Sequence, residues 1–390
     1  MAIKLQVEQL TKIFGRNPRS VMKRIDQGQS KDQILKETGH TVGLYDVNFS
    51  VEEGEVFVIM GLSGSGKSTL IRCLNLLHRP TKGRVFIDND NIVDYSKQQL
   101  RNLRKSKVAM VFQHFGIITH RTVLENVAYG LEIKGLEKEE REAIAREHIE
   151  LVGLAGYENQ MPDELSGGMK QRIGLARALA NDPDILLMDE PFSALDPLIR
   201  RDLQIELLEI QSKMKKTIIF ITHDVNEAFK IGDRVAVMKD GRMVQIGVPE
   251  EILEAPANDY IEEFVKDIDR MKVLQAKNAM MKPDPLVTIK DGLRIAIQRM
   301  KQHGISSVFV VDRERKLQGI ITIDDAVEAQ KANQPLQDIL RHDYETTDPE
   351  TYVQDLIPQA TQTKYPIAVV DETNRLRGII VRVSVLAALV

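Results

Sequence analysis

The sequence predicts an α/β protein made of a large domain of alternating strands and helices and a smaller α+β module behind it. Three observations lead to this prediction. Strand-like and helix-like patterns alternate from the start of the chain to about residue 250, a glycine-rich phosphate loop follows a buried strand at 55–60, and the C-terminal third contains an internal repeat. Together they favour an α/β nucleotide-binding fold followed by a separate, repeated unit.

Length and composition narrow the class of protein. A chain of 390 residues allows two or three domains with a large core. The formal net charge is −4, so no basic excess indicates binding to nucleic acid. The single cysteine, Cys73, excludes an intrachain disulfide and indicates a reducing compartment, and its apolar surroundings predict a buried helix position. No stretch approaches about 18 uninterrupted apolar residues, so we expect any membrane role to come through a partner.

An insertion interrupts the first pair of strands. Residues 3–15 alternate like a strand, and a second strand pattern resumes after residue 41. Between them, Ser30 and Gln33 form a capping-box pattern and Gly39 supplies a helix stop. We therefore expect a helical insertion at 16–41.

Prolines mark the boundary between the two parts of the chain. Pro249 and Pro256 bracket a last helical stretch, and the polar, Met-rich segment that follows ends in Pro283-Asp284-Pro285. We expect three regions, namely an α/β domain at 1–270, a linker at 271–282 and a C-terminal module at 283–390.

The C-terminal module repeats itself. Val310-Val311-Asp312 is followed by Gly319-Ile320-Ile321, and Val369-Val370-Asp371 is followed by Gly378-Ile379-Ile380 with the same spacing. Each unit reads as helix, strand, turn, strand, helix and cannot bury its apolar face alone, so the two should pack against each other. The predicted units are 283–334 and 335–390.

The phosphate loop is Gly61-Leu-Ser-Gly-Ser-Gly-Lys67-Ser68, which matches the pattern G-x-x-x-x-G-K-[ST]. It lies between the buried strand and a helical run, so backbone N–H groups and a helix N-terminus can surround phosphate oxygens. Lys67 is expected to bridge the outer phosphates and Ser68 to ligate Mg²⁺. The residues expected at the nucleotide are Gly61, Ser63, Gly64, Ser65, Gly66, Lys67, Ser68 and Thr69.

Polar side chains follow three further apolar strand patterns. Asp189 is expected to hold Mg²⁺ through water, and Glu190 to polarise the attacking water as general base. His223 is expected to bond the γ-phosphate and hold that water in line. Gln113 is expected to reach Mg²⁺ or the water and to report the nucleotide state to a partner.

The pentapeptide Leu165-Ser166-Gly167-Gly168-Met169 precedes a strong helix pattern. Ser166 and the N–H groups of Gly167 and Gly168 are therefore expected at a helix N-terminus, where a phosphate can bind.

In this order, these residues resemble the nucleotide-binding subunits of ABC transporters over residues 3–270. The matching motifs are Walker A (61–68), the Q-loop (Gln113), the signature (165–169), Walker B (185–189), the catalytic Glu190, the D-loop (193–196) and the H-loop (His223). The resemblance implies ATP and Mg²⁺ as ligands and a helical subdomain at about 115–180. It also implies that two copies close head to tail, with each ATP between one Walker A motif and the other copy's signature serine. Phe14 is then expected to stack on adenine and Asp196 to join the nucleotide site, whereas Met169 departs from the usual Gln.

The residues within these motifs and the insertion after Phe14 resemble those of the ATPase subunits of osmoprotectant importers, above all of glycine betaine importers of the OpuA type. This implies an ATPase at the cytoplasmic face of the membrane that energises import through permease subunits with a substrate-binding domain. An importer for another small solute, of the amino acid type, is the alternative. A soluble ABC ATPase acting on nucleic acid or ribosomes is disfavoured, because the chain has no long coiled-coil insertion, second ATPase domain or basic excess.

The repeat resembles a tandem CBS pair. In that family the pattern G-h-h-[ST]-x-x-[DN] contacts the ribose of adenosine ligands. The first repeat keeps it with Thr322 and Asp325, whereas the second has Val381 and Ser384. Both hairpin turns are basic, and the residues concerned are Arg313, Arg315, Lys316, Arg375 and Arg377. We expect regulation by a cyclic dinucleotide or adenine nucleotide, or by ionic strength at an anionic lipid surface. Solvated turns in a purely dimerising module are the alternative.

Overall fold

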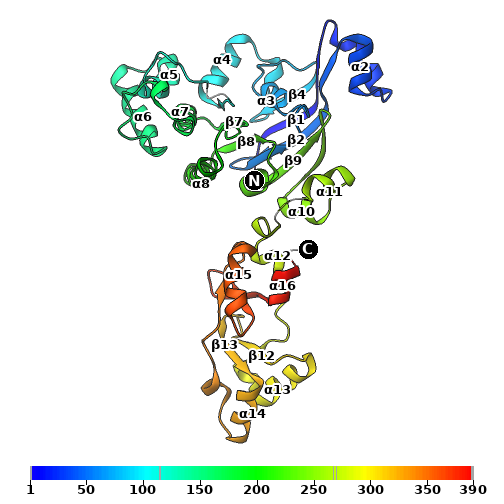
Figure 1. Ribbon diagram of the computed structural model, residues 1–390, viewed down its shortest axis with the longest axis vertical. Helices are drawn as coiled ribbons and strands as arrows, with labels where there is room; N and C mark the ends of the chain where they lie inside the picture. The colour runs from blue at the N-terminus through cyan, green and yellow to red at the C-terminus, as the bar shows by residue number, and fades with distance from the viewer. Residues whose placement is uncertain (1, 114–115, 267, 269, 388–390) are drawn as a thin grey trace. The chain divides into compact units, whose positions relative to one another are not determined.

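A computed structural model describes every residue except 1, 114–115, 267, 269 and 388–390. The chain divides into two compact units, Met1–Lys266 and Asp267–Val390 (Figure 1). The first is α/β and the second α+β, so the predicted fold class is confirmed. Among the described residues, no helix combines the length and the apolar character needed to cross a membrane.

The first unit contains two sheets. One has the strand order β2-β1-β4-β5 with antiparallel neighbours. The other has the order β10-β9-β3-β8-β7-β6, parallel from β9 to β6, with β10 antiparallel to β9. The strands are β1 Ile3–Phe14, β2 Thr41–Glu52, β3 Val56–Met60, β4 Lys82–Ile87, β5 Asp90–Asn91, β6 Val108–Val111, β7 Ile185–Asp189, β8 Thr217–Thr222, β9 Arg234–Lys239 and β10 Arg242–Gly247.

The central parallel strands are buried along their whole length. Every residue of β3, β7 and β8 is buried, as expected of strands that are covered on both faces. One apolar core contains residues of both sheets and of α3, and within it Phe49 of β2 stacks on Phe57 of β3 with ring centroids 5.1 Å apart. This packing fixes the strand ends at which the polar residues of the site lie.

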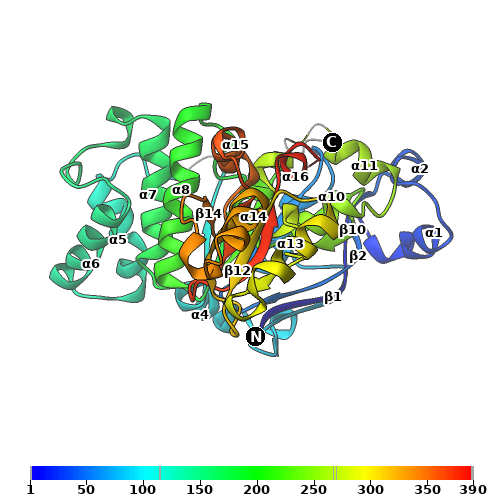
Figure 2. The same cartoon turned by 90° about the horizontal axis from the view of Figure 1, so that it is seen from below.

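Helices complete the first unit. The helices α5, α6 and α7 pack together at one end, and α1 and α2 lie at the opposite end (Figure 2). The first group corresponds to the predicted helical subdomain, whose expected start at residue 115 lies outside the described residues. The helices are α1 Met22–Asp26, α2 Lys31–Thr38, α3 Lys67–Leu74, α4 Lys97–Ser106, α5 Val123–Lys134, α6 Lys138–Leu151, α7 Gly167–Leu179, α8 Pro197–Met214, α9 Val225–Ile231, α10 Pro249–Glu254 and α11 Asp259–Val265, with short 3₁₀ turns at Pro18–Val21, Ile92–Asp94 and Pro162–Glu164.

The insertion between β1 and β2 is helical, as predicted. Ser30 Oγ accepts a 3.3 Å hydrogen bond from the backbone N–H of Gln33, and the Gln33 side chain accepts one of 3.1 Å from the Ser30 N–H. Gly39 ends α2 with a φ of +69°.

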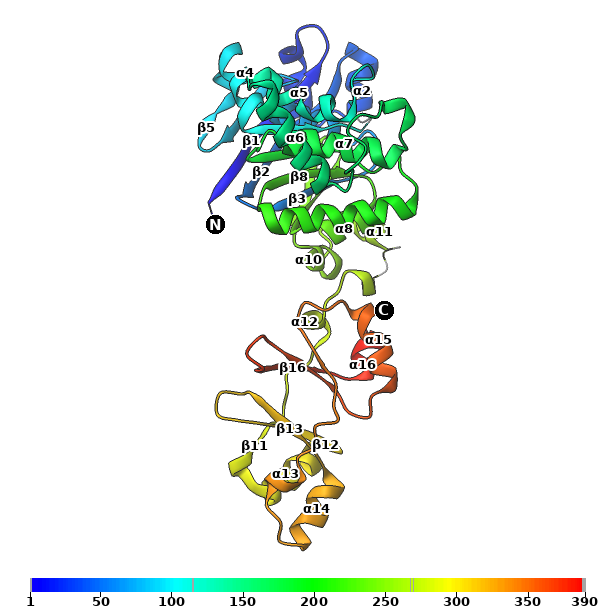
Figure 3. The same cartoon turned by 90° about the vertical axis from the view of Figure 1, so that its left-hand side faces the viewer.

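The second unit consists of two small sheets, β11-β12-β13 and β14-β15-β16, each with helices packed against it (Figure 3). The strands are β11 Val287–Thr288, β12 Ser307–Val311, β13 Leu317–Thr322, β14 Thr346–Thr347, β15 Ile367–Val370 and β16 Leu376–Ile380. The helices are α12 Ala276–Ala279, α13 Gly292–His303, α14 Ile323–Lys331, α15 Val353–Gln362 and α16 Arg382–Ala387, with 3₁₀ turns at Arg270–Lys272, Ile289–Asp291 and Leu336–Ile339.

The two repeats have the same strand register. Val310 pairs with Gly319 in the first hairpin, and Val369 pairs with Gly378 in the second. The two hairpin turns also bond to each other, because the Leu317 N–H donates to the carbonyl of Asn374 at 3.0 Å and the Leu376 N–H donates to the carbonyl of Arg315 at 2.9 Å. The prediction that the repeats pack against each other is confirmed.

The expected linker at 271–282 is wrong, because this segment belongs to the core of the second unit. Ala276 of α12 is fully buried against the second repeat. Met281 and Ile379 exchange two backbone hydrogen bonds of 2.9 and 3.0 Å. A Cβ on Gly378 would lie 2.5 Å from the Met280 sulfur, so the glycine permits this close approach. The boundary between the units lies at residues 266–267 instead.

Candidate nucleotide site

The phosphate loop joins the end of β3 to the start of α3. Gly66 caps the helix with a φ of +106°, and a Cβ there would lie 2.5 Å from the carbonyl oxygen of Gly43, so this position requires glycine. The N–H of Gly241, in the turn between β9 and β10, donates to the carbonyl of Ser65 at 2.8 Å. The loop is therefore held from both the antiparallel and the parallel sheet.

Lys67 is buried within its own loop, with 4% of its surface exposed. Its Nζ donates to the carbonyls of Gly61 at 2.8 Å and Leu62 at 3.2 Å, and lies 3.6 Å from Glu190 Oε1. Burial lowers the pKa of Lys67, and the Glu190 carboxylate opposes this shift. The buried hydroxyl of Ser65 has no hydrogen-bond partner among the described residues. An ammonium group and an unpaired hydroxyl in a cradle of backbone groups fit a phosphate anion.

Ser68 and Asp189 bring two oxygen atoms together at the start of α3. The Ser68 hydroxyl donates a 2.9 Å hydrogen bond to Asp189 Oδ1. Asp189 is 2% exposed, and burial raises the pKa of its carboxyl. Hydroxyl and carboxylate oxygens are the ligands that Mg²⁺ prefers, so this pair fits the ion. Arg72 lies 3.7 Å from Asp189 Oδ2. Sequence reasoning missed Arg72, although it lies four residues after Ser68 on the same face of the helix.

Glu190 has an uncommon backbone conformation, with a φ of +46°. Its N–H donates to the carbonyl of Ile221 at 3.1 Å, and the Ser193 hydroxyl donates to its carbonyl oxygen at 3.0 Å. A strained residue of this kind costs on the order of 1–3 kcal/mol and persists where its surroundings fix it. The side chain points to His223, whose Nδ1 lies 3.0 Å from Glu190 Oε2. The two side chains lie close together because Glu190 follows β7 and His223 follows β8, and these strands are parallel neighbours.

Gln113 lies at the D-loop in this structure. Its side-chain amide donates to the Ser193 hydroxyl at 3.4 Å. The Ser193 hydroxyl in turn donates to the Glu190 carbonyl, so Gln113 is linked through Ser193 to Glu190. The described hydrogen bonds of Gln113 do not include Ser68 or Asp189.

Phe14 lies beside the phosphate-loop helix. A Cβ on Gly43 would lie within 2.9 Å of the Phe14 ring and 3.1 Å of the Thr69 methyl group, so these two side chains flank Gly43. Lys12 lies 4.9 Å from the centre of the Phe14 ring, and the ring of His78 meets it edge-on at 5.4 Å. A half-buried aromatic ring next to the phosphate loop fits a stacked base.

The signature segment begins α7 and lies on the exposed surface. Ser166 Oγ accepts from the Met169 N–H at 3.3 Å, and both Ser166 and Gly167 are exposed. A Cβ on Gly168 would lie 2.6 Å from Ile199, so the signature packs closely on the start of α8. Asp196 caps that helix by accepting from the Ile199 N–H at 3.1 Å.

Known proteins match this sequence over almost its whole length. The ABC transporter family model matches residues 44–193, and the CBS domain model matches 276–332 and 336–390. The glycine betaine transport ATP-binding protein OpuAA of Bacillus subtilis (strain 168) is 53% identical over 387 residues, which cover 99% of this chain and 92% of that protein.

The chain belongs to the ABC transporter family.

Further relatives extend the match. The glycine betaine/carnitine transport ATP-binding protein GbuA of Listeria monocytogenes serotype 1/2a (strain 10403S) is 54% identical over 387 residues, covering 99% of this chain and 97% of that protein. A dimeric, post-hydrolysis structure of the ATP-binding cassette MJ0796 bound to ADP and Pi is 33% identical, covers 63% of this chain and 98% of the cassette, and has a TM-score of 0.54. The nucleotide site of this ABC transporter protein is accordingly that of an ATPase.

The CBS repeats of this ABC transporter protein place Thr322 and Asp325 in a local network. Thr322 caps α14 by accepting from the Asp325 N–H at 3.2 Å, and its hydroxyl donates to Asp325 Oδ2 at 2.7 Å. Arg341 forms a bidentate pair with Asp325 at 2.6 and 2.8 Å, which lowers the pKa of that carboxyl. The carboxylate of the first repeat is thus engaged by an arginine that lies in the second CBS match, 336–390.

The five basic residues of the CBS turns lie on two adjoining hairpins. Lys316 and Arg375 face each other in an antiparallel bridge where the turns meet. Arg377 pairs with Asp371 at 2.7 Å and Lys316 with Glu314 at 3.1 Å. The exposed members are Arg313, Arg315, Arg375 and Arg377.

Proposed function

We propose that this ABC transporter protein hydrolyses ATP to drive the uptake of a small methylated solute, such as glycine betaine, through a membrane permease. The observation that carries the ATPase step is the convergence of Lys67, Asp189, Glu190 and His223 at the ends of three neighbouring parallel strands. The solute is suggested by the names of the relatives above, which specify glycine betaine and carnitine.

Each residue of the site has a role that its position supports. Lys67 would exchange its contacts with the carbonyls of Gly61 and Leu62 for contacts with the outer phosphates. Glu190 would accept a proton from the attacking water, and His223, at 3.0 Å, would fix the carboxylate in place. Ser68 and Asp189 would hold Mg²⁺, which neutralises charge on the phosphates when bound. Gln113, whose amide donates to the Ser193 hydroxyl, would act through the D-loop.

A second copy would complete the site. Ser166 lies exposed at the N-terminus of α7, a helix of 13 residues whose dipole favours an anion. The related MJ0796 cassette is described as dimeric. We infer that Ser166, Gly167 and Gly168 contact the phosphates held by Lys67 of the other copy.

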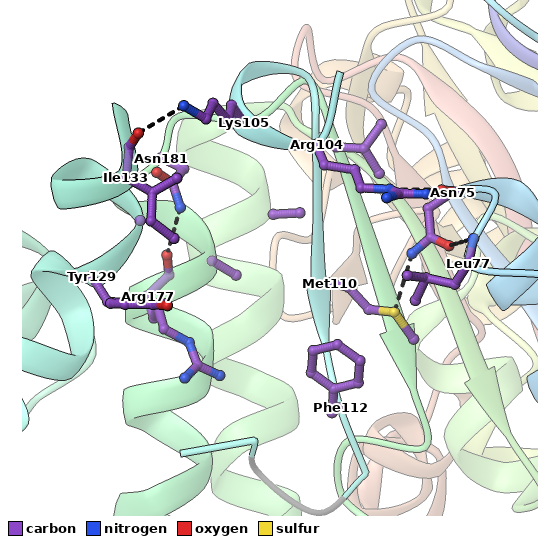
Figure 4. Close-up of a pocket in the computed structure, with 14 residues that line it drawn as sticks. Asn75, Leu77, Arg104, Lys105, Met110, Phe112, Tyr129, Ile133, Arg177 and Asn181 are labelled. Carbon is purple, nitrogen blue, oxygen red and sulfur yellow. Dashed lines mark hydrogen bonds between the residues drawn. The ribbon is translucent and has the colours of Figure 1, made fainter. Parts of the chain in front are cut away.

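A permease segment would dock in an apolar groove at the end of β6 (Figure 4). The groove has a volume of about 270 Å³, and its exposed apolar residues are Leu77, Phe112 and Ile133. Phe112 directly precedes Gln113, so a segment bound here lies one residue from the site. We expect the permease also to contact the segment after Gln113, residues 115–127, of which Phe115 lies outside the described residues. The permease would hold the protein at the cytoplasmic face of the membrane, and a substrate-binding domain attached to the permease would supply the solute.

The CBS repeats would regulate transport. Five basic side chains on adjoining turns support the sensing of ionic strength at an anionic lipid surface, because such attraction is screened over a Debye length of about 8–10 Å. A separate cleft of about 340 Å³, lined by Pro285, Ile305, Pro366 and Ile379, would suit an adenine nucleotide or cyclic dinucleotide. A purely dimerising role for the repeats is the alternative.

Reconstitution tests this function. The full-length chain is co-purified with its permease and placed in liposomes that contain Mg-ATP, and uptake of labelled glycine betaine is followed at low and high internal salt. We expect uptake that requires ATP and responds to salt, with the response lost when 267–390 is deleted. Failure of any methylated solute to accumulate in an ATP-hydrolysing complex would overturn the assigned substrate class.

A further inference from the structure

One arginine, Arg200, contacts both the D-loop and the residue that follows the proposed catalytic histidine. Arg200 lies in the first turn of α8, which begins directly after the D-loop. Its Nη2 donates to the carbonyl of Leu195, in the D-loop, at 3.2 Å, and its Nη1 donates to Asp224 Oδ2 at 3.4 Å. Asp224 is the residue after His223.

Asp224 is itself fixed at the corner between β8 and α9. Its Oδ1 caps α9 by accepting from the Glu227 N–H at 3.2 Å, and its own N–H donates to the Thr222 hydroxyl at 3.0 Å. Thr222 and Asp224 flank His223, so the backbone on both sides of the histidine is held by side chains.

A second, buried bridge lies one turn further along α8. The amide of Gln204 donates to Glu227 Oε1 at 2.9 Å, and Lys230 donates to the Gln204 amide oxygen at 3.3 Å. Gln204 and Glu227 are 7% and 6% exposed. Burial raises the pKa of Glu227, while hydrogen bonds from Thr222 and Gln204 oppose the shift. Because buried polar partners are costly to separate, this bridge anchors α8 to the histidine corner.

We propose that Arg200 is a positioning residue that makes the placement of His223 against Glu190 depend on the position of the D-loop. The planar guanidinium holds the Leu195 carbonyl and Asp224 in one fixed fork, so a shift of the D-loop moves the corner that carries His223. The buried Gln204–Glu227 bridge acts as the pivot. This inference rests on the proposed function, in which a second copy completes the nucleotide site. The D-loop residues Ala194 and Asp196 are exposed, so the approaching copy can contact them. Closure by the second copy then sets the catalytic geometry through Arg200.

Three variants of the full-length chain test this role. Arg200→Lys keeps the charge but cannot bond both acceptors in the same fork. Arg200→Ala removes both bonds. Asp224→Asn keeps the cap of α9, because asparagine is a good N-cap residue, but removes the charge that attracts Arg200. Arg201→Ala, at an exposed neighbouring position, is the matched control.

We expect kcat for ATP to fall about tenfold in each of the three variants, because small misplacements away from the reacting atoms reduce rates by factors of this size and more. KM for ATP and the thermal midpoint should stay close to the wild-type values, which separates positioning from a structural role. The double variant of Arg200→Ala and Asp224→Asn should lose no more than either single variant, since both act through one contact. Arg201→Ala should match the wild type.

Wild-type kcat in Arg200→Ala, additive losses in the double variant, or losses explained by a lower thermal midpoint would each overturn the role of Arg200. Wild type and Glu190→Gln are measured beside them. If Glu190→Gln hydrolyses ATP like the wild type, the proposed ATPase mechanism fails. If Glu190→Gln is inactive while Arg200→Ala is fully active, only the role of Arg200 fails.

Discussion

His223 Nδ1 lies 3.0 Å from Oε2 of Glu190, although the two residues are 33 positions apart in the chain. They meet because each follows a buried strand, and the two strands, β7 and β8, are parallel neighbours. Lys67, at the start of α3, approaches the other carboxylate oxygen, Glu190 Oε1, at 3.6 Å. The loop before it follows β3, which pairs with β8. The carboxylate therefore lies between an ammonium group and an imidazole.

Replacement of the carboxylate should separate binding from turnover. Glu190→Gln keeps the size and hydrogen bonding of the side chain but removes the base, so we expect kcat to fall by at least about 100-fold. The dissociation constant for ATP should change little, because Lys67 and the loop are intact. Steady-state ATPase assays and equilibrium nucleotide binding measure the two effects. Glu209→Gln, on the exposed face of α8, is the control, and wild-type turnover in Glu190→Gln would contradict the assigned role.

Changes to the Ser68–Asp189 pair should raise the Mg²⁺ concentration that ATPase activity requires. Of the pair joined at 2.9 Å, Ser68→Ala removes the hydroxyl and Asp189→Asn replaces the carboxylate with a neutral amide. We expect the concentration of Mg²⁺ needed for half-maximal ATPase activity to rise about 10-fold or more in each variant. ATP binding in the presence of a chelator should be the same in wild type and variants. A Ser212→Ala variant controls for the loss of a hydroxyl elsewhere, and unchanged magnesium dependence in Asp189→Asn would rule out this metal site.

Much of the nucleotide site could be predicted because each residue is tied to a local pattern. Three segments each predict both a backbone conformation and the ligand or reaction that it serves. They are the phosphate loop, the Asp189-Glu190 strand end and the glycine-rich start of α7. The alternation of strands and helices then places the strand ends together. The repeat predicted two similar units that pack against each other. The structure adds that their strands share a register, in which Val310 pairs with Gly319 and Val369 with Gly378.

Other features depend on contacts between segments that are distant in sequence. The polar composition of 271–282 suggested a linker, since nothing local shows that Ala276 fills a cavity in the second repeat. No local pattern shows the role of Arg200, because its partners Leu195 and Asp224 lie on different elements. Gln113 was expected to reach Mg²⁺ or the attacking water, and in the structure its amide donates to Ser193.

A charge in the groove should uncouple the protein from its permease. Ile133 lies on α5 in the groove and is exposed, so Ile133→Asp should change the stability of the isolated chain by less than about 0.5 kcal/mol. We expect it to abolish co-purification with the permease and to leave the ATPase activity of the free chain unchanged. Ile3→Asp, at an exposed position outside the groove, is the matched control. Full recovery of the permease with Ile133→Asp would mean that the groove is not the docking site.

The packing of α12 should make the second unit sensitive to a buried charge. Ala276 is fully buried, so Ala276→Glu places an unpaired carboxylate in the core of the second repeat and should cost about 3–5 kcal/mol. Met281→Glu, at a largely exposed side chain nearby, should cost far less. Thermal unfolding of both variants, followed by proteolysis to locate the unfolded unit, measures the difference. Equal stability of the two variants would restore 271–282 as a linker.

The turn of the second repeat should stabilise the protein in a pH-dependent way through Asp371. Its carboxylate accepts hydrogen bonds from the Thr373 hydroxyl at 2.7 Å and from the backbone N–H groups of Thr373 and Arg375 at 2.9 and 3.0 Å, and it pairs with Arg377. These contacts, led by the Thr373 hydroxyl, lower the pKa of Asp371 in the folded state. A carboxyl with a lowered folded pKa contributes stability above its ordinary pKa and loses it as the pH falls toward the folded value. Asp371→Asn should therefore lower the thermal midpoint of the second unit at pH 7.

That deficit should shrink as the pH falls from about 5 toward 3, because wild type then loses the stabilisation that the variant lacks. Glu372→Gln, at the exposed next position, controls for the loss of a carboxylate. Asp312 occupies the equivalent position in the first repeat and accepts from the N–H groups of Glu314 and Lys316, both at 2.8 Å. Because the two turns bond to each other through Leu317 and Leu376, a weakened second turn should also raise amide exchange at Leu317. A midpoint difference that stays constant from pH 7 to pH 3 would show that Asp371 acts through the shape of the turn and not through its charge.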